Sequence, residues 1–306
     1  MLLEALTSIQ AQRSFTLGRD LEVVVADDGS FRSDSVQAIA RAQAIHGVKV
    51  LRTRGRTGPA AARNFAVQGT CGEWLSFLDA DDLYAPDALE LRWATTQAHP
   101  SVGCVVTDYG EFAADAPFAP KELRGVIAST PRRRPAVQAA IDSGQTLVLN
   151  RPLKSFVGTM PMCTISVFVR RDAFIGLGGF PEGYDIGEDL HLWLRIAATQ
   201  TLAYVPRVTA YCRKGHASLT RSESRLNLKT ARCYEHLARD PLMAPVRRQL
   251  QALIAEGYLA EGYAARSRRE TQFAREMAWA AVRRRPWHPA GWLALALAGR
   301  APTTTG

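Results

Sequence analysis

The sequence predicts an α/β fold, with a mainly parallel central sheet, helices on both of its faces and a helical extension at the C-terminus. Short apolar runs typical of buried strands alternate with helical segments over the first two thirds of the chain, as in proteins with a parallel sheet. From residue 223 onward the pattern is helical to the end. We therefore expect one α/β domain over residues 1–222 and a basic helical region over residues 223–306.

The first half of the chain shows this alternation most clearly. Residues 1–12 carry apolar side chains at helical spacing, and residues 21–26 are a β-branched run that suits a buried strand and ends in the turn 27–30. The elements expected next are a helix over 33–44, a strand over 48–51, a helix over 58–67, a strand over 73–78, a helix over 86–96 and a strand over 102–107.

Residues 110–156 interrupt the alternation, because they contain two Pro-rich stretches, and we expect them to lie over the sheet as loop and short helix. Strand character then resumes at 164–169, followed by a helix over 188–199 and a short strand over 209–212. We expect a single sheet made of the strands at 21–26, 48–51, 73–78, 102–107 and 164–169.

Length and composition are those of an ordinary globular protein. The 306 residues are 47% hydrophobic and 22% charged, and no run reaches the roughly 18 apolar residues that a membrane-spanning helix needs. The first residues lack the basic start and long apolar core of a signal peptide. The five cysteines show no metal-ligand spacing and indicate a reducing compartment. We expect a cytoplasmic protein.

Basic charge is concentrated in the C-terminal third. The net charge is +9, and residues 201–306 hold 18 Arg and Lys against 7 Asp and Glu. Such a region can contact an anionic membrane surface, nucleic acid or an acidic protein. Because 33 of the 38 basic residues are Arg, a codon bias and a solvated helix face are the plainer explanation. We expect no nucleic-acid partner, and we keep peripheral contact with the inner face of the cell membrane as a hypothesis.

An acidic turn follows directly on the strand expected at 73–78. It carries three carboxylates in four positions: Asp79, Asp81 and Asp82. Carboxylates at the C-terminal end of a strand lie at the edge of an open α/β sheet where ligands bind, and an Asp-x-Asp there can hold a divalent cation that clamps a diphosphate. The plainer interpretation is a strand-to-helix turn in which Asp81 or Asp82 caps the next helix.

Three further short motifs accompany this turn in a fixed order. They are DDGS at 27–30, GPAAARN at 58–64 and, after the LDADD of 78–82, GEDLHLW at 187–193. Each motif alone is weak, but the set, over roughly residues 1–220, resembles the family 2 inverting glycosyltransferases of the GT-A fold. The resemblance implies an enzyme that takes a nucleotide-diphosphate sugar as donor and transfers the sugar to an acceptor hydroxyl.

The resemblance also implies donor-binding roles. Asp28 would accept the imide hydrogen of a uracil-type base, Arg63 would lie near the base and the diphosphate, and Asp79 would bond the ribose. The plainer alternatives are an Asx-turn in which Asp27 or Asp28 bonds the following backbone, and a salt bridge between Arg63 and a neighbouring Asp. By the same resemblance Asp81 would ligate Mn²⁺ or Mg²⁺, with Asp82 beside it as a supporting residue or helix cap.

A second acidic pair has the catalytic role that the resemblance implies. By resemblance, Asp189 is the base that takes the proton of the acceptor hydroxyl, and Glu188 contacts the acceptor. The plainer interpretation is that the helix dipole favours two acidic residues in a first turn. Trp193 is interpreted as core packing. His216 could reach the diphosphate or the metal, with a simple loop histidine as the alternative.

The start of the chain departs from the family pattern. Members normally begin with an apolar strand ending in a Pro-x-Tyr-Asn-like turn, placed before the helix with which this sequence opens. That strand is central in the sheet, so its absence would leave two neighbours unpaired. Met1 is a start placed too late, or the sequence is a fragment, or the strand is replaced from elsewhere, and we favour the late start. We expect a gap or an abnormally close pairing between the strands at 21–26 and 73–78.

The leading hypothesis is an inverting, metal-dependent glycosyltransferase that moves a sugar from a UDP-type donor to a glycan or lipid-linked acceptor in cell-surface polysaccharide or glycan synthesis. It predicts that Asp28, Asp81 and Asp189 face one cleft. The alternative is a truncated, non-catalytic remnant of the fold, with the helical tail as an interaction module. A nucleotidyltransferase would explain the acidic turn but not GEDLHLW.

Overall fold

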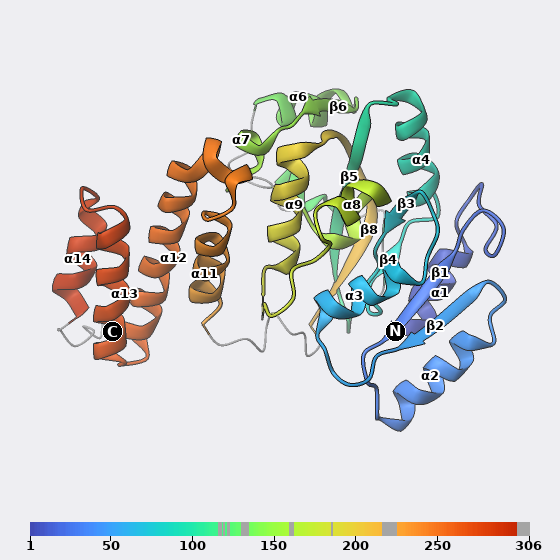
Figure 1. The fold of residues 1–306 in the computed structure, drawn as a ribbon, viewed down its shortest axis with the longest axis horizontal. Helices are drawn as coiled ribbons and strands as arrows, with labels where there is room; N and C mark the ends of the chain where they lie inside the picture. The colour runs from blue at the N-terminus through green and yellow to red at the C-terminus, as the bar shows by residue number, and fades with distance from the viewer. Residues whose placement is uncertain are drawn as a thin grey trace. The chain divides into compact units, whose positions relative to one another are not determined.

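The structure is a computed structural model that describes all residues except 116–117, 119, 121–122, 130–134, 159–161, 185, 216–224 and 299–306. Contacts between residues divide the chain into two compact units. The first unit comprises Met1–Glu182 and Leu192–His216, and the second comprises Gly183–His191 and Ala217–Gly306. Figure 1 labels the helices and strands of both units.

A small parallel sheet forms the start of the first unit. Its elements are α1 (Leu2–Gln10), β1 (Val23–Asp27), α2 (Ser33–Gln43) and β2 (Val48–Arg52). The two strands are parallel, and the buried side chains of Leu6, Val23 and Ala42 form a core between the helices and the sheet. These four elements match the helices and strands predicted at the start of the chain. They hold the turn that follows β1 at one end of the sheet.

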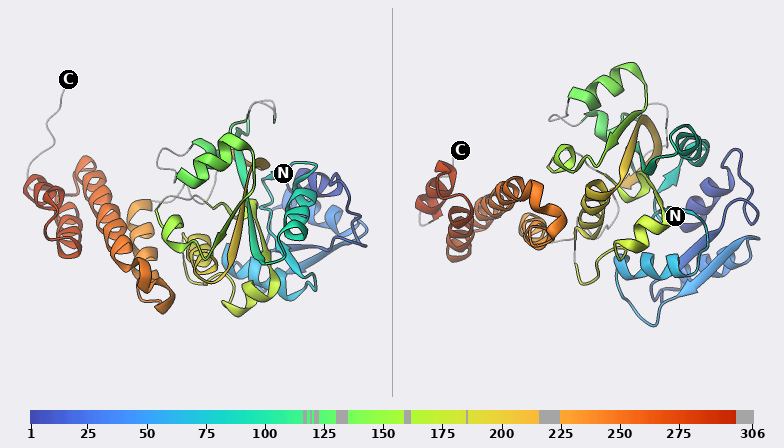
Figure 2. Two further views of the ribbon diagram at one scale, coloured as in Figure 1. Left: turned by 90° about the horizontal axis from the view of Figure 1, so that it is seen from above. Right: turned by 45° about the horizontal axis from the view of Figure 1, so that its top comes forward.

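A larger sheet forms the rest of the first unit. Its strands, in the order in which they pair, are β3 (Trp74–Ser76), β7 (Val167–Arg170), β5 (Val102–Ala113), β8 (Thr201–Lys214) and β4 (Leu83–Tyr84), with β6 (Leu147–Asn150) also paired to β8. Helices α4 (Ala88–Ala98) and α9 (Glu188–Thr199) lie on opposite sides of this sheet (Figure 2). Buried Val105, Phe168 and Ala203 make the core on one face. The predicted α/β class with helices on both faces is confirmed.

The five strands that were expected in one sheet are divided between two sheets, so that expectation was wrong. β1 and β3 are not paired with each other, which is the gap expected between the strands at 21–26 and 73–78. Each of the two strands pairs on its other side, β1 with β2 and β3 with β7. The backbone N–H and C=O groups of each strand on that side are therefore hydrogen-bonded.

The larger sheet is mixed rather than mainly parallel. β5 runs parallel to β8, whereas β7 runs antiparallel to both β3 and β5. The chain between β5 and β7 returns to the sheet from the end at which β5 leaves it, and such a connection makes neighbours antiparallel. The strand expected at 209–212 is the second half of β8, whose pairing with β5 shifts register around Pro206. Proline is tolerated in a strand at such a bulge, and here it obscured the strand in the sequence.

The segment between β5 and β7 contains more regular structure than the sequence predicted. Its short elements are α5 (Val126–Ser129), α6 (Pro135–Ser143), β6 and α7 (Leu153–Phe156), and the 3₁₀ turn Thr164–Ser166 precedes β7. Asp108 on β5 fixes the start of α5, because its carboxylate accepts hydrogen bonds from the N–H groups of Ile127 and Ala128, each at 2.9 Å. Burial raises the pKa of Asp108, although these hydrogen bonds oppose the rise.

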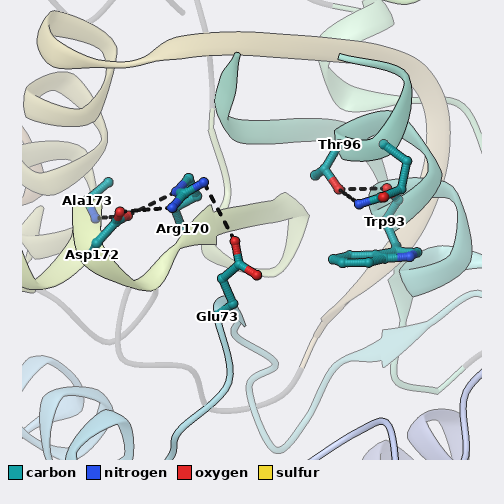
Figure 3. Close-up of polar contacts among 7 residues, drawn as sticks. Glu73, Trp93, Thr96, Arg170, Asp172 and Ala173 are labelled. Atoms are coloured by element: carbon teal, nitrogen blue, oxygen red, sulfur yellow. Dashed lines mark hydrogen bonds and ion pairs between the residues drawn. The ribbon is translucent and has the colours of Figure 1, made fainter. Parts of the chain in front are cut away.

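The β3–β7 pair is held at its end by Arg170. Figure 3 shows the Arg170 guanidinium between Glu73, at 3.6 Å, and Asp172, at 3.0 Å. Asp172 stands in the first turn of α8 (Arg171–Gly176). The guanidinium also lies over the ring of Trp74, 5.9 Å from its centroid. These contacts fix the strand β3 from which the acidic turn emerges.

The second unit is helical in its described C-terminal part, as the sequence predicted. Its elements are α11 (Leu226–Leu237), the 3₁₀ helix Pro241–Val246, α12 (Arg247–Ser267), α13 (Thr271–Arg284) and α14 (Pro289–Ala298). Ile254, Ala278 and Ala294 belong to the core that α12, α13 and α14 share. Among the helices that the structure describes, none is both long and apolar enough to cross a membrane.

Candidate active site

The DDGS turn is joined to the start of α3 (Pro59–Gln68) through the carboxylate of Asp28. Its Oδ1 accepts hydrogen bonds from the N–H and the hydroxyl of Thr57, at 2.8 and 2.7 Å, and from the hydroxyl of Thr53 at 3.0 Å. Its Oδ2 accepts one from the N–H of Gly58 at 2.8 Å, so that oxygen retains capacity for a second donor. Gly58 has a φ of +90°, which a side chain would strain, and it turns the chain into α3.

The two aspartates of this turn have separate structural tasks. Buried Asp27 accepts a hydrogen bond from the N–H of Ser30 at 2.9 Å, and this is the Asx-turn that the sequence allowed. Burial tends to raise the pKa of Asp28, but the hydrogen bonds from Thr57, Gly58 and Thr53 outweigh burial and hold that pKa below its usual value. Asp28 is therefore ionised at neutral pH, as an acceptor for a ring N–H should be.

Arg63 and Asp79, both assigned to the donor by resemblance, lie together. Arg63 extends from the middle of α3, and its Nη2 donates to Asp79 Oδ1 at 2.7 Å. The Arg63 side chain is 16% exposed and that of Asp79 is 42% exposed, so the pair lies at the surface with the carboxylate toward solvent. The salt bridge that was the plainer role for Arg63 is present, and it places the two motifs side by side.

The acidic turn itself is fixed by strand β8. Asp82 is 4% exposed, its N–H donates to the Asp79 carbonyl at 3.0 Å, and its Oδ1 accepts from the N–H of Arg213 at 2.8 Å. The Arg213 guanidinium donates through Nε to the Asp81 carbonyl at 2.9 Å. Asp82 does not cap α4, because the residue at that position is Asp87. Sequence reasoning missed Arg213, which directly follows the strand it predicted at 209–212.

The electrostatics of this turn fit a cation. Burial raises the pKa of Asp82 to about 7, and the charges of Asp81 and Asp79 add to the rise. Three carboxylates thus lie close together in this turn, and carboxylate oxygens are the ligands that Mn²⁺ and Mg²⁺ prefer. Within the described residues, no three His, Cys, Asp or Glu side chains gather as a preformed metal-binding group. A cation here would need further oxygen ligands from elsewhere.

Phe180 connects the acidic turn to the last motif. Its ring lies 5.4 Å from the Arg63 guanidinium, 5.2 Å from the ring of Phe77 and 5.4 Å from the ring of Trp193. Asn64 holds the Phe180 backbone on both sides, donating to its carbonyl at 2.8 Å and accepting from its N–H at 2.9 Å. Trp193 is 1% exposed, so its interpretation as core packing is confirmed.

Glu188 and Asp189 stand in the first turn of α9 and belong to the second unit. The loop before them is fastened to α11, because the Cys233 thiol donates to the Gly187 carbonyl at 3.3 Å. Gly187 has a φ of +94°, and a Cβ there would lie 2.9 Å from the Cys233 sulfur, so glycine is required. Burial raises the pKa of Cys233 to about 12, and the charges of Asp189 and Glu188 contribute to that rise.

Three ring side chains of the second unit form a cluster: Tyr184, His191 and His236. Tyr184 and His191 are close to the acidic pair in the sequence, and His236 lies on α11. The Tyr184 hydroxyl is hydrogen-bonded to His236 Nδ1, and the His191 ring centroid lies 5.6 Å from that of Tyr184 and 5.7 Å from that of His236. Burial raises the pKa of Tyr184 to about 12. Sequence reasoning missed this cluster because Tyr184 and His236 are 52 residues apart with no shared motif.

The structure therefore brings together Asp28, Arg63 and Asp79 with the turn that carries Asp81. Whether Asp189 faces the same cleft stays a prediction, because it lies in the other unit. His216 lies outside the described residues.

Comparison with known proteins decides the family. The sequence model of glycosyl transferase family 2 matches residues 1–160, which is more than half of the chain. The chain belongs to glycosyl transferase family 2. The four motifs and the α/β architecture are thus those of a glycosyltransferase.

Two curated relatives of this family 2 chain are longer proteins. It is 30% identical over 199 residues to the pre-mycofactocin glycosyltransferase of Mycobacterium tuberculosis, covering 64% of this chain and 38% of that protein. It is 25% identical over 207 residues to an uncharacterized glycosyltransferase of Rickettsia conorii, covering 67% of this chain and 29% of that one. The chain spans well under two thirds of the length of both.

Solved structures confirm the GT-A fold. S. aureus TarS 1–349, in complex with UDP-GlcNAc, superposes with a TM-score of 0.64 and 17% identity, over 92% of this chain and 77% of that one. The mannosyltransferase PcManGT of Pyrobaculum calidifontis, in complex with GDP-Man and Mn²⁺, gives 0.55 and 19%, over 95% of this chain and 74% of that one. At these identities the likeness concerns the fold alone.

Proposed function

We propose that this chain is an inverting glycosyltransferase that moves a sugar from a UDP-type nucleotide sugar to the hydroxyl of a glycan or lipid-linked acceptor, in the cytoplasm. One observation carries the proposal: contacts join all four motifs. Asp28 holds the start of α3, Arg63 of α3 pairs with Asp79, and Trp193 packs on Phe180, over which Arg63 lies. Residues that only shaped separate turns would not need to meet in this way.

The donor side follows from three of these groups. Asp28 is ionised and retains an acceptor position, which suits the imide N–H of uracil. The exposed Asp79 carboxylate suits the ribose hydroxyls, and the planar guanidinium of Arg63, which holds it, is of the type that binds diphosphate oxygens. The two solved neighbours bind UDP-GlcNAc and GDP-Man, which supports a nucleotide-sugar donor for this fold.

Metal dependence is part of the proposal. Asp81 would ligate Mn²⁺ or Mg²⁺, with His216 as a further ligand and oxygen atoms of the donor diphosphate completing the shell. When bound, the cation offsets the negative charge that develops on the departing nucleoside diphosphate. The excess of carboxylates around Asp82 and the Mn²⁺ in the PcManGT complex support this assignment.

Asp189 is proposed as the catalytic base. The acceptor oxygen forms a bond to the anomeric carbon, the bond from that carbon to the phosphate oxygen breaks, and the nucleoside diphosphate leaves with the electron pair. Asp189 takes the proton of the acceptor hydroxyl on the face opposite the leaving group, and Glu188 contacts the acceptor. Asp189 stands in the same helix as Trp193, one turn before it.

The test is sugar transfer or donor hydrolysis with the purified chain. UDP-sugars and GDP-sugars are compared with Mn²⁺ or Mg²⁺ present and with a chelator. Release of UDP that needs the metal supports the proposal. Binding of UDP without any turnover, at every metal and acceptor tried, would favour a non-catalytic member of the family.

A further inference from the structure

The last two helices expose large aromatic side chains. Trp287, in the turn between α13 and α14, is 95% exposed, and on α14 Trp292 and Leu293 are 48% and 56% exposed. Trp279 of α13 is 39% exposed and contacts Trp292 edge to face at 5.9 Å. Large apolar groups are normally scattered singly over a soluble surface, so a cluster of this kind indicates a contact with another phase or molecule.

The cluster is held in place rather than loosely attached. Trp292 Nε1 donates to the Pro286 carbonyl at 2.7 Å, which fixes its ring beside the turn that carries Trp287. Gly291 packs on Val282 of α13, where a Cβ would approach to 3.0 Å. The exposed rings therefore belong to a packed helical hairpin. Packing of α13 against α14 leaves them exposed.

Arginines lie close to the cluster in the sequence of α13 and line a groove beside the end of that helix. Arg283 lies one turn after Trp279 on α13, and Arg284 and Arg285 directly precede the Pro286–Trp287 turn. A groove of about 720 Å³ is lined by Arg284 and Arg285 together with Arg247 and Arg248 of α12. Residues 247–298 hold nine Arg against four Glu, a net charge of +5.

Arg247 and Arg248 stand where a helix disfavours them. They occupy the first turn of α12, whose N-terminus carries partial positive charge, and no side chain caps its first N–H groups. The Arg247 guanidinium has one protein partner, because its Nε donates to the Ala238 carbonyl at 3.3 Å. An anion in the groove would offset the remaining positive charge, so the groove suits phosphate oxygens.

We propose that the Trp279–Trp287–Trp292 cluster and its flanking arginines are a docking face for an anionic membrane surface. Indole rings favour the boundary between headgroups and acyl chains, and arginines beside them pair with lipid phosphates. Charge complementarity favours an anionic surface over a second copy of the chain. In a dimer, two regions that each carry a net charge of +5 would face and repel each other. The face is independent of sugar transfer, so its test needs no donor.

The test is co-sedimentation of the chain with vesicles of phosphatidylcholine alone or of phosphatidylcholine mixed with phosphatidylglycerol. Binding is expected only with phosphatidylglycerol, and it should fade from low to high salt. Trp287→Ala should weaken it about tenfold or more. Arg248→Gln with Arg283→Gln should weaken it about 25-fold, since each basic side chain near such a surface contributes a factor of about five.

Matched controls come from the first unit. Trp93, which Figure 3 shows on α4, is 38% exposed, and Trp93→Ala should bind like the parent. The pair Arg13→Gln with Arg41→Gln removes two exposed arginines far from α13 in sequence and should lower binding much less than the Arg248 and Arg283 pair. Circular dichroism checks that each variant is folded.

Four outcomes would overturn the proposal. The first is equal binding to neutral vesicles, and the second is equal weakening by the control variants. The third is no vesicle binding with self-association that Trp287→Ala abolishes, since that would make the cluster an interface between copies. The last outcome is displacement of the chain from vesicles by a low concentration of inorganic phosphate or pyrophosphate, but not by salt of equal ionic strength. The groove would then be a site for a free phosphate compound instead.

Discussion

Arg92 Nη1 donates to the hydroxyl of Ser76 at 2.8 Å, although Arg92 is entirely buried. Its Nη2 donates to the Ile165 carbonyl at 2.8 Å and to the Thr209 hydroxyl at 3.1 Å, and its guanidinium lies 4.8 Å from the centre of the Tyr84 ring. One side chain on α4 therefore ties together the strands from which the acidic turn starts and to which it returns.

The consequence for the turn is direct. The Tyr84 hydroxyl donates to the Phe77 carbonyl at 2.7 Å, and the Ser76 hydroxyl lies 2.9 Å from it. Residues 77 and 84 bracket the three carboxylates, so Arg92 and Tyr84 close the base of the loop that carries them.

We predict that Arg92→Met lowers the free energy of unfolding by about 2–4 kcal/mol, because several buried hydroxyls and a carbonyl lose their donor. Urea denaturation measures the change. Arg41→Met, at an exposed position of α2, should change stability by less than about 0.5 kcal/mol. A loss no greater than that of the control would show that water replaces the guanidinium.

Asp28→Asn should lower the free energy of unfolding by about 1–3 kcal/mol at neutral pH, because a charged acceptor of four hydrogen bonds is lost. The pKa of Asp28 is lower in the folded state than in the unfolded chain, so the stability it gives is complete above the unfolded value near 4. It is lost as pH falls through the folded value.

The difference between parent and Asp28→Asn should thus shrink in acid. Urea denaturation at neutral pH and at pH values below about 4 checks it. Asp142→Asn, at an exposed position of α6, is the control. A difference that stays constant with pH would attribute the effect to shape and not to charge.

Asp81→Ala should abolish the Mn²⁺-dependent binding of UDP while the fold stays intact. Removing one of several mutually repelling carboxylates should leave the metal-free protein at least as stable. Isothermal titration calorimetry with UDP and Mn²⁺ measures the loss, with Asp142→Ala for comparison. Unchanged binding would remove Asp81 from the metal site.

Asp189→Asn should lower turnover by about 10²–10⁴-fold and leave donor affinity unchanged, because the amide keeps the shape of the side chain and cannot take a proton. Asp34→Asn is a matched control, since Asp34 also stands in the first turn of a helix. Near-normal turnover would make Asp189 a helix-start residue only. Loss of donor affinity would place it on the donor side.

Much of the candidate site could be predicted from the sequence because it lies in short motifs at strand ends. The pairing of Arg63 with Asp79 is an example, since Asp79 directly follows a predicted strand and Arg63 lies on the helix that the GPAAARN motif begins. Arg92, Arg213 and the Tyr184–His236 contact could not be predicted, because their partners come from distant segments and no local pattern marks them. Sheet order failed for the same reason: pairing of β3 with β7 is a contact across more than 90 residues.

The hydrogen bond from Cys233 to Gly187 limits how far this protein can be shortened from its C-terminus. The loop before Glu188 and Asp189 belongs to the same compact unit as α11 and the later helices, and the thiol of α11 fills the space that Gly187 leaves open. A version shortened before residue 226 would therefore lose the support of the acidic pair together with the tail. The C-terminal helices are not a detachable appendage but part of the framework on which the proposed base is mounted.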